Sequence, residues 1–316
     1  MSAVKPMRDV LIEEITLRMD ANDSIFFVSG DFGSPKLDAL RERHPDRFIN
    51  VGIAEQNLIN ICAGLALEGF IVYAYAIAPF ITMRCYEQIR VNMAILSQER
   101  PMNVNLIGVG AGYSYEMSGP THQSLEDLAI MRALANVEVF SPADWATVES
   151  YVDYTVESQT IKYLRLDSKP LPNVHQKPEN LSVSLGYHEL QKGNEVCLLS
   201  TGYMTHSALI VAEKLKQEGI QVGVIDVFAL TTLQRDSLSQ TLQNYKHAIS
   251  LEEGFLEKGG FDTLISGIIR QHELSTKFHG MGVDDHYSFE LGGRDILHSI
   301  NKIGIEDIIE KVKANL

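Results

Sequence analysis

Two short stretches of this sequence hold side chains that could move a proton. Residues 51–57 read Val-Gly-Ile-Ala-Glu-Gln-Asn and place the carboxylate of Glu55 between an apolar segment predicted as a strand and an apolar segment predicted as a helix. Residues 118–127 place His122 directly after a Gly-Pro-Thr sequence, at the end of a glycine-rich loop. Ligands bind open α/β sheets where strands end and helices begin. Either residue alone would usually be an ion-paired or solvated side chain, but together they favour a functional site.

The elements that must position these residues alternate along the chain between strand-like and helix-like segments. The expected strands are apolar without regular alternation, which is typical of strands covered on both faces. They span residues 25–29, 48–52, 71–76, 104–109, 137–140, 161–166, 196–200, 222–227, 248–251 and 277–281. Expected helices include residues 4–20, 81–97, 124–135 and 205–217, the third of which begins with a capping box formed by Ser124 and Asp127. This order predicts an α/β protein with two doubly wound, mostly parallel sheets.

The clearest domain break lies at residues 168–172, which read Ser-Lys-Pro-Leu-Pro. Two prolines in three residues cannot continue a helix or a central strand. We therefore predict a first domain over residues 1–172, a linker over residues 173–184 and a second domain over residues 185–316.

Composition and charge argue against several classes of protein. A hydrophobic content of 45% and a charged content of 22% describe a globular protein. The net charge of −14 argues against nucleic acid or an anionic membrane surface as partner, although a phosphorylated substrate stays possible. The longest apolar run, residues 69–83, is shorter than the ~20 residues that a membrane span needs, and no signal peptide is recognised, so we expect a cytoplasmic location. No nicotinamide or P-loop fingerprint and no cluster of metal ligands is found in the sequence, so we predict no metal site on this chain.

Four motifs, in their order and spacing, make the chain resemble the C-terminal half of transketolase. They are Val-Gly-Ile-Ala-Glu-Gln at residues 51–56, Tyr-Glu-Gln-Ile-Arg at 86–90, Gly-Pro-Thr-His-Gln at 119–123 with Leu-Glu-Asp-Leu-Ala at 125–129, and Phe-Ser-Pro-Ala-Asp at 140–144. The resemblance covers nearly the whole chain. It implies a pyrimidine-binding domain of a thiamine diphosphate enzyme, followed by a transketolase C-terminal-like domain.

The resemblance also implies roles for individual residues. The family's cofactor glutamate falls on Glu55, where it hydrogen-bonds the aminopyrimidine ring of thiamine diphosphate and promotes loss of the proton from thiazolium C2. The family's substrate-facing histidine falls on His122. The other expected cofactor contacts are Asp31, Phe80, Ile81, Met83 and Tyr86, with Phe80 and Ile81 as alternatives for the residue that stacks on the pyrimidine. The expected substrate contacts are Arg8, Ser34, Ser118, Arg165 and Lys169, beside His122.

One part of the family's site has no counterpart in this sequence. Transketolases hold Mg²⁺ and the diphosphate with a Gly-Asp-Gly motif and a later asparagine, and neither is recognised here. The resemblance therefore implies a split enzyme, in which an N-terminal, diphosphate-binding subunit holds Mg²⁺ (or Ca²⁺). Because the family's cofactor lies between two chains and closed two-fold assemblies are the commonest, we expect self-association and an α₂β₂ complex.

Two departures from the family's pattern concern the substrate. Transketolases commonly carry Glu-Asp before Gly-Pro-Thr-His, where this chain has Met117 and Ser118. They often have a phosphate-contacting histidine where this chain has Gly110. Both changes put the usual pentose phosphate substrates in doubt and predict weaker use of phosphorylated acceptors, without affecting the two-carbon transfer itself.

The favoured function is therefore transfer of a two-carbon ketol unit from a ketose to an aldose, within a complex of two kinds of subunit. The nearest alternative is the beta subunit of a 2-oxo-acid dehydrogenase, which has the same fold, glutamate and split arrangement. A third is a non-catalytic assembly subunit. The presence of both Glu55 and His122 speaks against this third alternative.

Overall fold

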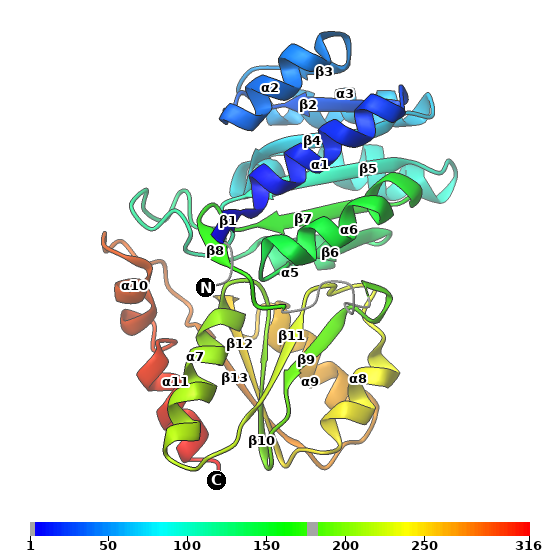
Figure 1. The fold of residues 1–316 in the computed structure, drawn as a ribbon. Coiled ribbons are helices and arrows are strands. Elements are labelled where there is room, and N and C mark those ends of the chain that lie inside the picture. Colours follow the sequence, from blue (N-terminus) through cyan, green and yellow to red (C-terminus); the bar gives the residue numbers. More distant parts are fainter. Residues whose placement is uncertain (1–3, 176–182) are drawn as a thin grey trace.

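The computed structural model describes residues 4–175 and 183–316, which form two α/β sheets stacked end to end (Figure 1). The first sheet is six-stranded, entirely parallel and ordered β3-β2-β4-β5-β7-β6. Its strands are β2 (Ile25–Ser29), β3 (Phe48–Asn50), β4 (Ile71–Ile77), β5 (Asn103–Val109), β6 (Val137–Phe140) and β7 (Ile161–Leu166). The predicted fold class is confirmed. Most of the predicted linker, residues 176–182, lies outside the described residues.

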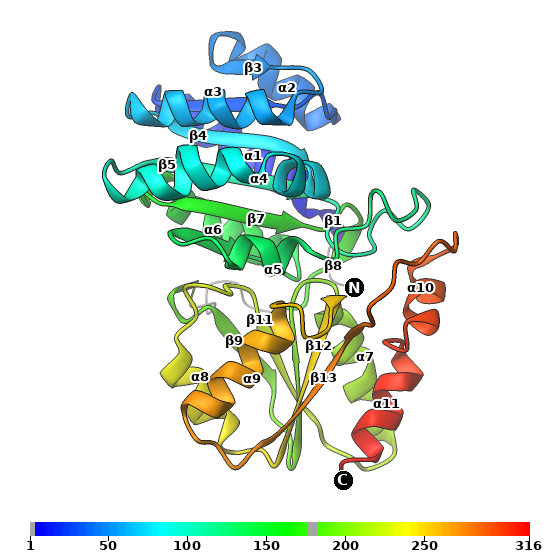
Figure 2. The ribbon, with the colours of Figure 1, turned by 180° about the vertical axis from the view of Figure 1, so that it is seen from behind.

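Helices cover both faces of this sheet, which explains why its strands are apolar throughout. The helices α1 (Met7–Ala21), α2 (Pro35–Arg43) and α6 (Trp145–Glu157) lie on one face, and α3 (Glu55–Leu67), α4 (Tyr86–Ile89) and α5 (Asp127–Arg132) lie on the other (Figures 1 and 2). Strand β4 shows the period of two directly. Its Tyr73 and Tyr75 pack with the first group of helices, whereas Val72 and Ala74 pack with the second.

The second sheet has the order β13-β12-β10-β11-β9, and only β9 runs antiparallel to its neighbour. Its strands are β9 (Tyr187–Gln191), β10 (Val196–Ser200), β11 (Gly223–Val227), β12 (His247–Phe255) and β13 (Lys277–Val283). Helices α8 (Arg235–Leu242) and α9 (Phe261–Gln271) cover one face, and α7 (Met204–Gln217) and α11 (Ile305–Lys313) cover the other. A last helix, α10 (Arg294–Ile300), leads from β13 towards α11. The sequence did not predict β9, because this half-buried edge strand lacks an apolar run.

Three local predictions were wrong. The segment before α1 is a short strand, β1 (Val4–Pro6), which pairs with β8 (Pro170–Pro172); prolines are accepted there because both strands lie at an edge. The segment predicted as one helix over residues 81–97 is broken into π-helical, α-helical and 3₁₀ turns, beginning with a π-turn at Phe80–Arg84. Helix α5 begins at Asp127 rather than Ser124, because the Asp127 carboxylate accepts hydrogen bonds from β7 instead of closing a capping box.

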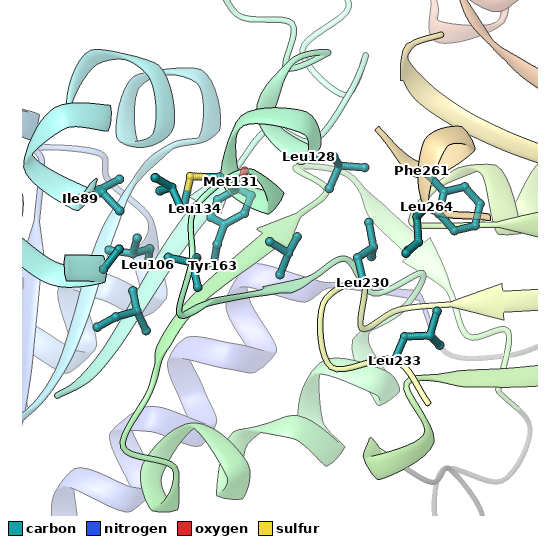
Figure 3. Packing of buried hydrophobic residues seen from close by; sticks show 14 of the residues in the cluster. Ile89, Leu106, Leu128, Met131, Leu134, Tyr163, Leu230, Leu233, Phe261 and Leu264 are labelled. Carbon is teal, nitrogen blue, oxygen red and sulfur yellow. The ribbon is translucent and has the colours of Figure 1, made fainter. Parts of the chain in front are cut away.

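The two domains share one hydrophobic cluster (Figure 3). In that cluster Leu128 and Met131 of α5 lie between the first sheet and residues of the second domain, including Leu230 and Phe261. The backbone joins the domains as well, since the Leu230 amide donates to the Val139 carbonyl (2.8 Å). The domains are therefore packed as one body around the edge formed by β6 and α5.

Within the described ranges, no helix combines the length and apolarity that a membrane crossing would require.

Candidate active site

The carboxylate of Glu55 sits at the turn from β3 into α3. Gly52 adopts a φ of +74°, and its amide donates to the side chain of Asn50 (2.9 Å), which closes the turn. Glycine is the residue that takes this conformation without strain. Helix α3 then begins at Glu55, so its side chain lies at the positive end of the helix dipole and is only 3% exposed. A buried acid at the carboxyl edge of a parallel sheet is placed as a ligand-binding group.

Arg84 is the partner of Glu55 in this structure. Its Nη1 donates to Glu55 Oε2 (2.6 Å), and its guanidinium lies 4.6 Å from the centre of the Phe80 ring. The arginine side chain is 45% exposed, so it covers Glu55 from the solvent side. The π-turn at Phe80–Arg84 brings both residues to the same place, and such turns are frequent at functional sites.

His122 joins this group through Phe80. The two rings meet edge to face with centroids 5.3 Å apart, and the ring of Tyr115 stands edge-on to His122 at 6.4 Å. The Thr121 hydroxyl lies 3.0 Å from Nδ1 of the histidine. Glu55, Arg84, Phe80 and His122 therefore form one continuous set of contacts, although Glu55 and His122 are far apart in the sequence. The structure brings together the two residues that the sequence singled out.

The loop that holds His122 is anchored from both domains. On its own side, the amides of Gly110 and Ala111 donate to the Leu166 carbonyl (2.9 and 3.1 Å). From the second domain, Glu253 Oε2 accepts from the Tyr113 amide (3.2 Å). These bonds fix the first part of the loop close to the end of β7.

A buried ionic cluster supports that anchor. Arg294 donates through Nη2 to Asp167 (2.6 Å) and through Nε and Nη2 to Glu253 (2.7 and 2.9 Å). His298 Nε2 lies 2.6 Å from the same glutamate. Burial alone would raise the pKa of Glu253, but Arg294 and His298 hold it well below the ordinary value. Sequence reasoning missed this cluster, because its members are spread over about 130 residues and match no motif.

The structure separates the expected cofactor contacts into two groups. Ile81 is fully buried in the hydrophobic core, and the Tyr86 hydroxyl donates to the Ile130 carbonyl (3.0 Å), so both side chains point away from Glu55. Phe80 contacts Arg84 and His122, which favours it over Ile81 as the pyrimidine-facing residue. Met83 is partly exposed beside it. Asp31, with a φ of +60°, accepts from Asn50 (2.9 Å) at the end of β2, on the same edge of the sheet.

The expected substrate contacts also divide. Arg165 is a correction: it is buried, ion-paired with Asp127 (2.8 Å) and bonded through Nη2 to the carbonyls of Ser124 and Glu253, so it joins the domains and does not face a substrate. Ser34 is buried as well, and its hydroxyl accepts from the Leu37 amide at the start of α2.

The remaining three lie where a substrate could reach them. Ser118 is exposed in the His122 loop, and Lys169 forms a half-exposed ion pair with Glu116 of that loop (2.9 Å). Arg8 lies at the start of α1, beside Tyr75, and donates through Nε to Asp9 (2.9 Å). Among the residues that the structure covers, no group of three or more potential ligands could hold a metal ion.

Comparison with known proteins supports this site. Models of the transketolase pyrimidine binding domain and the transketolase C-terminal domain match residues 4–172 and 186–299. One of the two subunits of the apulose-4-phosphate transketolase of Actinobacillus succinogenes is 28% identical over 316 residues, which cover 98% of each chain. The putative transketolase C-terminal section of Methanocaldococcus jannaschii is 27% identical over 80% of this chain and 78% of its own.

Full-length and structural relatives agree. Human transketolase is 31% identical over 79% of this chain, but that match spans only 40% of the human protein. A solved structure described as a split gene transketolase, inactive beta4 tetramer, superimposes with a TM-score of 0.86 and 28% identity, covering 98% of this chain and 97% of that one. The resemblance read from the four motifs is confirmed. The chain belongs to the transketolase family, with the pyrimidine-binding domain followed by the C-terminal domain.

Proposed function

We propose that this chain is the C-terminal subunit of a split transketolase, which transfers a two-carbon ketol unit from a ketose to an aldose. The observation that carries the proposal is the contact between Phe80 and His122 beside the buried carboxylate of Glu55. Its setting adds support, because the chain aligns over 98% of its length with a subunit of an apulose-4-phosphate transketolase. The expected cytoplasmic location belongs to the same proposal.

The residues present fit the pyrimidine end of thiamine diphosphate. Glu55 is a buried carboxylate at a strand-to-helix turn, and the Phe80 ring beside it offers a flat apolar face. When bound, thiamine diphosphate would supply the carbanion chemistry of the transfer. Glu55 would hold the pyrimidine by sharing a proton with it. Arg84, which now pairs with Glu55 and stacks on Phe80, would have to release both groups as the cofactor enters.

His122 would act on the substrate. It is half-buried, and its ring is held between Phe80 and Tyr115. An imidazole is well suited to give or take a proton near neutral pH. We assign it the sugar oxygen at the reacting carbonyl, where a proton must move as the carbon–carbon bond is made or broken.

A partner subunit is part of the proposal. The chain would bind an N-terminal, diphosphate-binding subunit that holds Mg²⁺ (or Ca²⁺), and it would self-associate to give an α₂β₂ complex. Support comes from two relatives, one named as a subunit of its transketolase and the other a beta4 tetramer described as inactive. Exposed apolar side chains near Glu55 are available to such an interface, including Ile53 (75% exposed) and Met83 (38%).

The test is reconstitution with a diphosphate-binding transketolase subunit. The chain alone, with thiamine diphosphate and Mg²⁺, should show no ketol transfer, and the complex should transfer from a ketose donor to an aldose. The complex carrying Glu55→Gln serves as the control and should assemble but not turn over. Full activity of the isolated chain would overturn the need for a partner. Oxidative decarboxylation of a 2-oxo acid without ketol transfer would favour the dehydrogenase alternative, and assembly without any turnover would favour a structural subunit.

A further inference from the structure

The side-chain space above Gly110 is filled by Tyr115. A Cβ atom added at position 110 would lie 2.3 and 2.5 Å from Cε2 and Cδ2 of the tyrosine ring. Gly110 also has a φ of +109°, a conformation that other residues rarely adopt. The glycine and the tyrosine ring therefore belong together: no larger residue fits at 110 while the ring keeps its place.

Tyr115 stands where a substrate held by His122 would pass. Its ring is edge-on to that of His122, and it follows the anchored first part of the loop. Burial raises the pKa of the Tyr115 phenol to about 12, although the nearby Arg8 guanidinium opposes the rise. At neutral pH the hydroxyl is therefore protonated and can donate a hydrogen bond.

Tyr75 and Arg8 complete the surroundings. The Tyr75 side chain is fully buried at the end of β4 and stacks on Phe32 (5.3 Å), yet its hydroxyl makes no hydrogen bond of normal geometry to the described residues. A buried polar atom without a partner is costly and points to a missing ligand or water. Burial would lower the pKa of Arg8, but Tyr75 and Asp9 raise it, so the guanidinium stays charged beside the two phenols.

These three groups are all donors, and together they suit an anion. A guanidinium with neutral hydroxyl donors is a common way to bind a phosphomonoester, because each bond to the charged oxygens is stronger than one between neutral groups. Ser118 and Gly110 alone predicted a weakened hold on a phosphorylated sugar. The structure changes that expectation by placing Tyr115 in the space above Gly110.

We propose that Tyr115 is a specificity-determining residue, which with Tyr75 and Arg8 receives the phosphorylated end of the sugar substrate. This inference rests on the proposed ketol transfer and names the class of substrate for the same site. Its ring would also limit the room beside His122, so that short or compact sugar phosphates are favoured over bulky ones.

The experiment compares ribose 5-phosphate with ribose as acceptors in the reconstituted complex. Tyr115→Phe keeps the ring and removes one donor to a charged group, so kcat/KM for ribose 5-phosphate should fall about 10-fold, with less than about a 2-fold change for ribose. The matched control is Tyr287→Phe, since that exposed tyrosine bonds Glu126 outside the site. It should change neither ratio. An equal effect of Tyr115→Phe on both sugars would overturn the inference.

A second readout does not depend on turnover. Titration of the complex with ribose 5-phosphate, followed by calorimetry, should show binding that ribose lacks and that Tyr115→Phe weakens about 10-fold. If phosphate-dependent binding is lost in the variant while no sugar is turned over, the subsite stands and the proposed function fails. If turnover is normal and binding ignores the hydroxyl, the subsite fails alone.

Discussion

Replacing Arg294 by methionine should unfold the chain more easily than any surface change. The guanidinium lies between Asp167 and Glu253, whose side chains are each only 2% exposed. Methionine fills much of the same volume, so packing against Tyr203 is largely kept. The loss is therefore mainly electrostatic: two buried carboxylates remain without their shared cation.

Breaking a buried ion pair by removing one partner costs roughly 3–5 kcal/mol. Glu253 would keep His298 and the Tyr113 amide, so we expect a value near the middle of that range, about 4 kcal/mol. With a urea m-value of ~3 kcal/mol/M, the midpoint of unfolding should fall by roughly 1–2 M.

The assay is urea unfolding followed by near-UV circular dichroism, at one protein concentration. Lys313→Met is the control, because its ion pair with Glu218 is half-exposed and such pairs are worth about 0–1 kcal/mol. Adding Glu253→Gln to Arg294→Met should restore part of the loss, since it removes one of the orphaned charges. A midpoint shift of Arg294→Met no larger than that of the control would refute the reasoning.

The same cluster predicts a direction for pH. Because the folded pKa of Glu253 lies below its unfolded value, its contribution is present above about pH 4.5 and is lost as pH falls from there. Arg294→Met should therefore flatten the acid limb of the stability curve. The measurement is the urea midpoint between about pH 3 and 7, and an unchanged acid limb would contradict the pairing.

Three further outcomes test the site itself. Glu55→Gln should reduce turnover of the reconstituted complex by ~10²–10⁴-fold without lowering its melting temperature, and exchange of the cofactor C2 proton at the wild-type rate, seen by NMR, would show that this acid is not the one used. Arg84→Met should leave Glu55 buried without its partner, which lowers the melting temperature of the chain but weakens cofactor binding to the complex by no more than a few-fold, because the arginine must leave on binding; calorimetry with thiamine diphosphate tells the two effects apart. Gly110→Ala should cost about 1–3 kcal/mol from its positive φ and displace the Tyr115 ring, so a stable variant with unchanged use of ribose 5-phosphate would contradict the packing described.

The sequence by itself determined the fold class and the two residues at the centre of the site. Apolar runs separated by helical segments predict parallel sheets, because a strand buried on both faces has no polar positions to show. Glu55 and His122 could be named in advance, because each follows a local pattern of strand, turn and helix whose direction is dictated by nearby residues. These signals are short in range, so the amino-acid sequence alone carries them.

The tertiary structure decided which side chains share the site. Phe80 and Ile81 are neighbours in sequence, yet one contacts His122 and the other is buried in the core, because a π-turn shifts the register of the helix at that point. Arg165 was expected at a substrate and lies instead against Asp127, because β7 directs it towards the other domain. Ion pairs and ring contacts depend on the distance between atoms far apart in the chain. Folding sets that distance, and no local pattern reports it.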